Sequence, residues 1–133
     1  MIPPFNEHGS LPPGVHSATL DEIDARFGHL SELRRVQMES VRWMVDLAVR
    51  AGARRVVLNG SFVTDIMEPN DVDCVLLFLP GKRRDDQAFD ELQVGLPFLD
   101  VAIADQAAFN EFVDQVFSAD RHDTPKGMIE VIL

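Results

Sequence analysis

Residues 56–78 read VVLNGSFVTDIMEPNDVDCVLLF, and this stretch decides the fold. Two apolar runs flank a polar connection; the first ends at Asn59-Gly60-Ser61 and the second opens with Asp71-Val72-Asp73. Alternate residues of a β-strand point to the same side, so a strand beginning at Asp71 presents both carboxylates on one face. Two like charges that close together are unfavourable unless a cation lies between them. The stretch therefore predicts two strands that join at a Gly-Ser turn and an acidic pair.

A third carboxylate, Asp100, stands in a later apolar run, where residues 97–103 read PFLDVAI. An unpaired carboxylate buried in an apolar strand costs free energy, which favours a functional role for Asp100. Each of the three features also has an ordinary explanation when taken alone. A Gly-Ser pair is typical of a strand-to-loop turn, and an Asp-x-Asp pair is typical of a solvated strand start.

Taken in order, Gly60-Ser61, Asp71-x-Asp73 and Asp100 resemble the signature of the nucleotidyltransferase superfamily, which has a DNA polymerase beta-like palm. The resemblance covers residues 41–103. It implies that Gly60 and Ser61 contact nucleotide phosphates and that the three aspartates are catalytic and hold Mg²⁺ or Mn²⁺. Asp100 would also help to deprotonate the attacking hydroxyl.

The chain is most similar to small stand-alone nucleotidyltransferase-like proteins of bacteria and archaea. Its opening MIPPF and the LPPG at residues 11–14 add a likeness to an uncharacterised group of them. The resemblance implies transfer of a nucleoside monophosphate from a nucleoside triphosphate (NTP) to a hydroxyl of a protein or small molecule. Small acidic domains of this family act as antitoxins of toxin–antitoxin pairs, so the expected protein partners are a cognate toxin or further copies of the chain.

Two departures from the family leave a second hypothesis open. Minimal nucleotidyltransferases carry an arginine soon after Gly-Ser, whereas Phe62-Val63-Thr64 stands here. The sequence also offers no second domain to hold a base or an acceptor. The alternative is therefore a non-catalytic interaction or regulatory module that retains the nucleotidyltransferase fold.

Composition narrows the class of protein. A chain of 133 residues with 46% hydrophobic and 26% charged residues suits one globular domain. The net charge of −10 and the short basic clusters, of which Lys82-Arg83-Arg84 is the longest, disfavour nucleic-acid binding. No apolar run reaches the length of a membrane span. Cys74 is the only cysteine, which excludes an intrachain disulfide and favours a cytoplasmic setting.

The pattern along the chain predicts an α+β fold, a small mixed sheet of about four strands covered by helices and similar to the nucleotidyltransferase palm. Residues 1–16 hold four prolines and form an irregular N-terminal arm, and residues 17–133 form a single nucleotidyltransferase-like domain. Thr19 and Ser31 are predicted helix caps. The expected helices span 20–28, 32–51, 85–94 and 106–117, the expected strands 55–59, 71–79, 98–104 and 128–133, and 120–125 form a polar loop.

The other chemistry-bearing side chains give weaker signals. The four histidines, which include His8 and His122, show no metal-ligand spacing and are expected in surface or packing roles. Lys126 precedes a glycine and has access to a phosphate, but a surface role is the simpler expectation. Strand alternation turns Cys74 away from the aspartates, so we expect it in the core.

Overall fold

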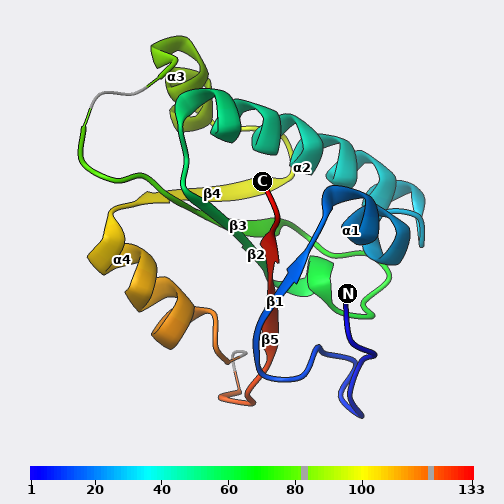
Figure 1. Ribbon diagram of the computed structural model, residues 1–133. Helices are drawn as coiled ribbons and strands as arrows, with labels where there is room; N and C mark the ends of the chain where they lie inside the picture. Colours follow the sequence, from blue (N-terminus) through cyan, green and yellow to red (C-terminus); the bar gives the residue numbers. More distant parts are fainter. Residues whose placement is uncertain (82–83, 120–121) are drawn as a thin grey trace.

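The computed structural model describes residues 1–81, 84–119 and 122–133, so Lys82, Arg83 and the loop residues Asp120 and Arg121 lie outside the described residues. The strands form one mixed sheet in the order β1-β5-β2-β3-β4 (Figure 1). Strand β2 is antiparallel to β3 and β5, whereas β1 pairs with β5, and β3 with β4, in parallel. The strands are β1 (Gly14–Ala18), β2 (Arg55–Asn59), β3 (Val72–Leu77), β4 (Leu99–Ala104) and β5 (Gly127–Val131).

The α+β class is confirmed, but the sheet has five strands where about four were expected. The additional strand is β1, which begins inside the segment predicted to be irregular. Its residues are mostly exposed and only Ala18 is fully buried, so no alternation of apolar residues marks it. Backbone pairing with β5 holds it instead. The arm before it packs on the domain, with Leu11 buried and Phe5 partly buried against the core.

Three helices cover one face of the sheet and a fourth covers the other (Figure 1). Local signals explain where they start and stop. Thr19 and Glu22 form the predicted capping box, Ser31 accepts a hydrogen bond from the backbone of Arg34, and Gly52 ends the long helix with φ of +95°. The helices are α1 (Leu20–Phe27), α2 (Glu32–Ala51), α3 (Asp86–Val94) and α4 (Gln106–Glu111). Within the described residues, no helix is long and apolar enough to cross a membrane.

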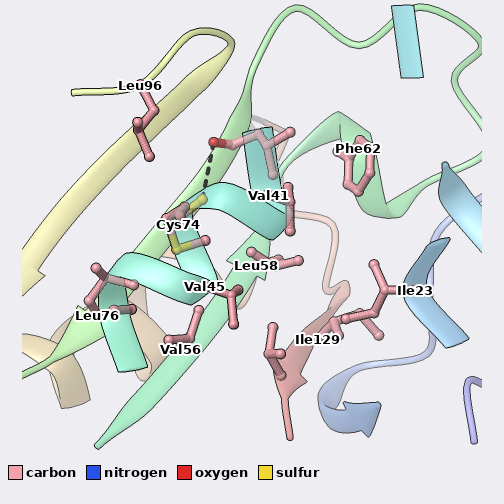
Figure 2. Packing of buried hydrophobic residues seen from close by; sticks show 14 of the residues in the cluster. Ile23, Val41, Val45, Val56, Leu58, Phe62, Cys74, Leu76, Leu96 and Ile129 are labelled. Atoms are coloured by element: carbon pink, nitrogen blue, oxygen red, sulfur yellow. Dashed lines mark hydrogen bonds between the residues drawn. The ribbon is translucent and has the colours of Figure 1, made fainter. Parts of the chain in front are cut away.

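Strand alternation divides the core between the two faces of the sheet. Leu58, Cys74 and Leu76 belong to the larger cluster, under α1, α2 and α3 (Figure 2). Val57 and Val75 belong to the smaller cluster, under α4. Cys74 is buried on the face opposite Asp73, as expected, and burial raises the pKa of its thiol.

The helix expected over 106–117 changes its geometry part of the way along. Regular α-helix ends at Glu111, and residues Phe112–Val116 form one wider π-helical turn. The backbone N–H of Phe117 donates to the carbonyl of Phe112, 2.7 Å away, and the two rings pack edge to face. Such turns often occur at functional sites, and this one brings the Phe117 backbone to the end of β2.

Candidate functional site

Three polar residues form a row across the sheet where β2 ends and β3 and β4 begin. Asn59 pairs with Asp73, and Asp73 pairs with Asp100. Directly paired residues project to the same face of a sheet. Val57 and Val75, two residues away on the same strands, pack under α4. The row therefore faces the α4 side, and strand pairing brings together two aspartates that are distant in sequence.

A cleft of about 500 Å³ opens beside this row. Gly60 and Ser61 line it together with Asp71 and Asp73, so the structure unites both halves of the sequence motif. Asp100 stands next to Asp73 but outside the cleft lining of the described structure. The other lining residues are His8, Ser10, Asn59, Thr64, Asp65, Ile66, Asn70, Val116, Phe117, Ala119, His122 and Lys126.

Gly60 is required by the position of Asp73. Its φ of +84° and ψ of −166° belong to a region that is essentially restricted to glycine. A Cβ on Gly60 would lie 2.6 Å from Oδ2 of Asp73. The carboxylate therefore occupies the space that a side chain at Gly60 would fill. Ser61 follows directly and begins a short 3-10 turn, Ser61–Val63.

Asp73 lies in a setting that disfavours the ionised form of its carboxyl. It is partly buried, and this burial raises the pKa of its carboxyl; the negative charges of Asp100 and Asp71 raise that pKa further, while the positive charge of Lys126 lowers it. Loss of hydration and like-charge repulsion both disfavour the ionised form. A further positive charge or hydrogen-bond donor would therefore stabilise the ionised carboxylate.

The sequence argument for Asp100 is wrong in one respect. Asp100 is exposed, whereas the flanking apolar residues suggested burial. Strand β4 is an edge strand, and its apolar side chains Leu99, Val101 and Ile103 turn to the opposite face, where they pack against the core. The burial penalty invoked from the sequence does not apply, and the position of Asp100 beside Asp73 is what connects it to the site.

The acids of the cleft fit a magnesium ion by their chemistry. In the described part of the chain, no group of three His, Cys, Asp or Glu side chains is arranged to hold a metal ion by itself. Magnesium, however, is usually bound through one or two carboxylates, water and substrate phosphates, without a cage made wholly of protein ligands. Asp71 and Asp73 line one cleft and supply two such carboxylates.

Asn59 is a residue of the site that the sequence reasoning missed. It is only 3% exposed, and its Nδ2 donates a long hydrogen bond of 3.4 Å to the carbonyl of Phe117. Its Oδ1 is buried and, among the residues that the structure describes, has no hydrogen-bond partner. An unsatisfied buried acceptor costs about 1–3 kcal/mol, so a group that donates to Oδ1 would stabilise this arrangement. The available signal was a polar residue that ends an apolar run next to Gly-Ser.

Arg34 shapes the segment after Gly60, a role that the sequence analysis did not assign to it. Its side chain is fully buried within the domain, and burial lowers the pKa of its guanidinium while the charge of Asp65 opposes that shift. Its donors fix the backbone of residues 61–66 against α2. The carbonyls that accept from it are those of Phe27, Ser61, Phe62, Thr64 and Ile66.

The N-terminal arm closes one side of the cleft. Ser10 forms a β-bridge with Thr64, and the backbone N–H of Asp65 donates to the carbonyl of Gly9, 3.0 Å away. His8 therefore lines the cleft, as do His122 and Lys126 from the other end of the chain. The sequence reasoning gave these three surface or packing roles, because nothing local relates residues so far apart.

The fold and the cleft define a small α+β protein with an acidic cleft at the junction of β2, β3 and β4. The chain belongs to a family of unknown function, DUF6932, whose sequence profile matches residues 3–132. No curated protein and no solved structure matches it.

Proposed function

We propose that the protein binds a magnesium–NTP complex in this cleft and transfers the nucleoside monophosphate to a hydroxyl group. The observation that carries the proposal is the setting of Asp73. Its carboxylate is partly buried close to Asp100 and Asp71 and packs against Gly60. Its strand partner Asn59 has a buried Oδ1 that finds no hydrogen-bond partner in the described part of the chain. Several carboxylates that lie close together favour a bound cation, and a metal-bound triphosphate supplies one.

Each polar group has a role in this proposal. Asp71 and Asp73 would hold the metal ion, which neutralises negative charge on the phosphates when it is bound. Ser61 would donate its hydroxyl to a phosphate oxygen, as hydroxyl groups do. Asn59 would accept a hydrogen bond from the ligand or from water that accompanies it.

The transfer step uses Asp100 as the base. The acceptor oxygen forms a bond to the α-phosphorus, and the bond between that phosphorus and the oxygen that bridges to the β-phosphate breaks. Its electron pair leaves with pyrophosphate, and the hydroxyl proton passes to the carboxylate of Asp100. The exposure of Asp100 suits this role, because an acceptor can approach from solvent while the triphosphate lies in the cleft.

Metal titration tests the first half of the proposal. Mg²⁺ or Mn²⁺ should raise the melting temperature of the wild type, because a ligand that binds only the folded state stabilises it. Asp73→Ala should abolish the rise, whereas Asp90→Asn, which removes an exposed charge on α3, should leave it unchanged. An equal rise in all three proteins would contradict a metal site at Asp73.

Label transfer tests the second half. Calorimetry should show Mg-NTP binding, and α-labelled NTP should label a co-purifying partner or a small-molecule hydroxyl. Asp100→Asn should retain binding and lose transfer by about 10²–10⁴-fold, the usual contribution of a general base. If the wild type binds no Mg-NTP at millimolar concentration and labels nothing, the enzyme proposal falls. The chain is then better described as an interaction module, and a cognate toxin becomes the partner to seek.

A further inference from the structure

We propose that Lys126 binds the phosphates of the nucleotide and takes the place of the arginine that minimal nucleotidyltransferases carry after Gly-Ser. This inference rests on the proposed function and names the side chain that would supply a positive charge to the phosphates. The segment after Gly60 cannot supply a cation. Phe62 and Val63 are buried in the core, and the buried guanidinium of Arg34 donates to backbone carbonyls of the same segment.

Strand pairing places Lys126 at the motif. Strand β5 pairs with β2 through Val57 with Glu130 and Leu58 with Ile129. This antiparallel register directs the start of β5, which Lys126 directly precedes, towards the end of β2 and the turn that follows it. The pairing of Asn59 with Asp73 brings the start of β3 to the same turn from the other side. Lys126, Ser61 and Asp71 all line the cleft.

The backbone around Lys126 is fixed on both sides. Its own N–H donates to the carbonyl of Ser118, and the N–H of Gly127 donates to the carbonyl of Leu11, each over 3.0 Å. Gly127 is itself wedged, because a Cβ there would lie 2.1 Å from the carbonyl oxygen of Pro12. The backbone of Lys126 is therefore held in one position at the cleft.

Charge indicates what Lys126 binds. A triphosphate brings several negative charges into a cleft that already contains Asp65, Asp71 and Asp73. One divalent ion offsets only part of that charge. The positive charge of Lys126 is close enough to lower the pKa of Asp73, so it acts in the same space. Lysine is a common phosphate ligand, and its ammonium can donate three hydrogen bonds.

The test measures the binding of two phosphate ligands and the response to Mg²⁺ alone in each variant. Inorganic tripolyphosphate with Mg²⁺, and MgATP, are titrated by calorimetry; Mg²⁺ alone is followed through melting temperature. Lys126→Ala should weaken binding of both phosphate ligands by about tenfold to a hundredfold, the loss expected for a charge-assisted hydrogen bond. It should bind Mg²⁺ alone at least as tightly as the wild type, because a competing positive charge has been removed.

Matched variants separate binding from structure. Lys126→Arg keeps the charge and should bind within a few-fold of the wild type. Arg54→Ala removes an exposed positive charge at the other end of β2 and should change neither the binding of the phosphate ligands nor the response to Mg²⁺. Lys126→Gln repeats the measurement if Lys126→Ala does not fold.

Three results would overturn the inference. If Lys126→Ala binds the phosphate ligands as the wild type does, Lys126 is not a phosphate ligand, and the proposed function stands without it. If the variant loses its response to Mg²⁺ together with the phosphate ligands, Lys126 supports the structure of the site instead. If the wild type binds no Mg-triphosphate at all, the proposed function fails, and the inference fails with it.

Discussion

Replacing Gly60 by alanine should destabilise the fold by roughly 2–4 kcal/mol. The backbone conformation of Gly60 is one that costs an alanine about 1–3 kcal/mol. The new Cβ would also lie 2.6 Å from Oδ2 and 3.2 Å from Cγ of Asp73. Because that carboxylate is the end of a short side chain, it can rotate partly away, and we expect the low end of the usual cost of crowding, about 1 kcal/mol.

Gly95 provides a matched control for the backbone term. It has φ of +104° and ψ of 163°, close to the conformation of Gly60, and nothing lies within 4 Å of a Cβ built on it. Gly95→Ala should therefore cost only the backbone strain of about 1–3 kcal/mol. The excess loss in Gly60→Ala measures the contact with Asp73.

Urea denaturation followed by circular dichroism gives the free energies of unfolding. In the double variant Gly60→Ala with Asp73→Ala the carboxylate is gone, and the remaining Cβ of Asp73 was already at an ordinary 3.6 Å. A double-mutant cycle should then show a coupling of about 1 kcal/mol. If Gly60→Ala costs no more than Gly95→Ala, or if the two changes are additive, the close packing of Gly60 on Asp73 is refuted.

Three further predictions concern stability. Folding raises the pKa of Asp73, so the ionised carboxylate destabilises the folded state. This destabilisation is absent at a pH below the pKa of the unfolded state and complete at a pH above the pKa of the folded state. Asp73→Asn should therefore be more stable than the wild type at pH 7, and urea denaturation at acid pH should show that this gain in stability disappears. Arg34→Met should lower the free energy of unfolding by on the order of 3–5 kcal/mol, because it strands buried carbonyls; a loss below 1 kcal/mol would contradict the role given to Arg34. Thr19→Ala should lower the melting temperature through a loss of about 0.5–2 kcal/mol, and an unchanged melting temperature would show that the capping box is not formed in solution.

The sequence predicted best those elements whose causes are local. Helix α2 is bounded by Ser31 and Gly52, residues that act within one turn of its ends. Strand β2 is an apolar run that ends at the polar residue Asn59, directly before Gly60. Strand β1 lacked such a signal, because its stability comes from pairing with β5 at the other end of the chain. The burial predicted for Asp100 was wrong for a related reason. Asp100 is exposed because β4 is an edge strand, and the order of strands in a sheet is not encoded in the residues around Asp100.

The residues of the site were also predictable only where a local sequence pattern marks them. Asp71 and Asp73 share one strand start and Gly60-Ser61 precedes them in sequence, so a short-range pattern identifies these residues. Lys126 and His8 reach the cleft only through the pairing of β5 with β2 and through the arm. No spacing in a single sequence encodes those contacts. The place of Asn59 in the site follows from its burial and from an oxygen that has no partner among the described residues, and both are properties of the packed chain.

The position of β5 also bears on how the protein reaches its native state. The last strand in sequence is inserted between β1 and β2, so the first strand has no partner in the sheet until the last one is in place (Figure 1). Contacts between such distant segments are slow to form. During synthesis the segments of β2, β3 and β4 emerge before β5, so they can meet before the wall of the cleft that carries Lys126 is present. A chain cut before Lys126 would therefore retain Asp65, Asp71 and Asp73 and lose the lysine that lines the same cleft.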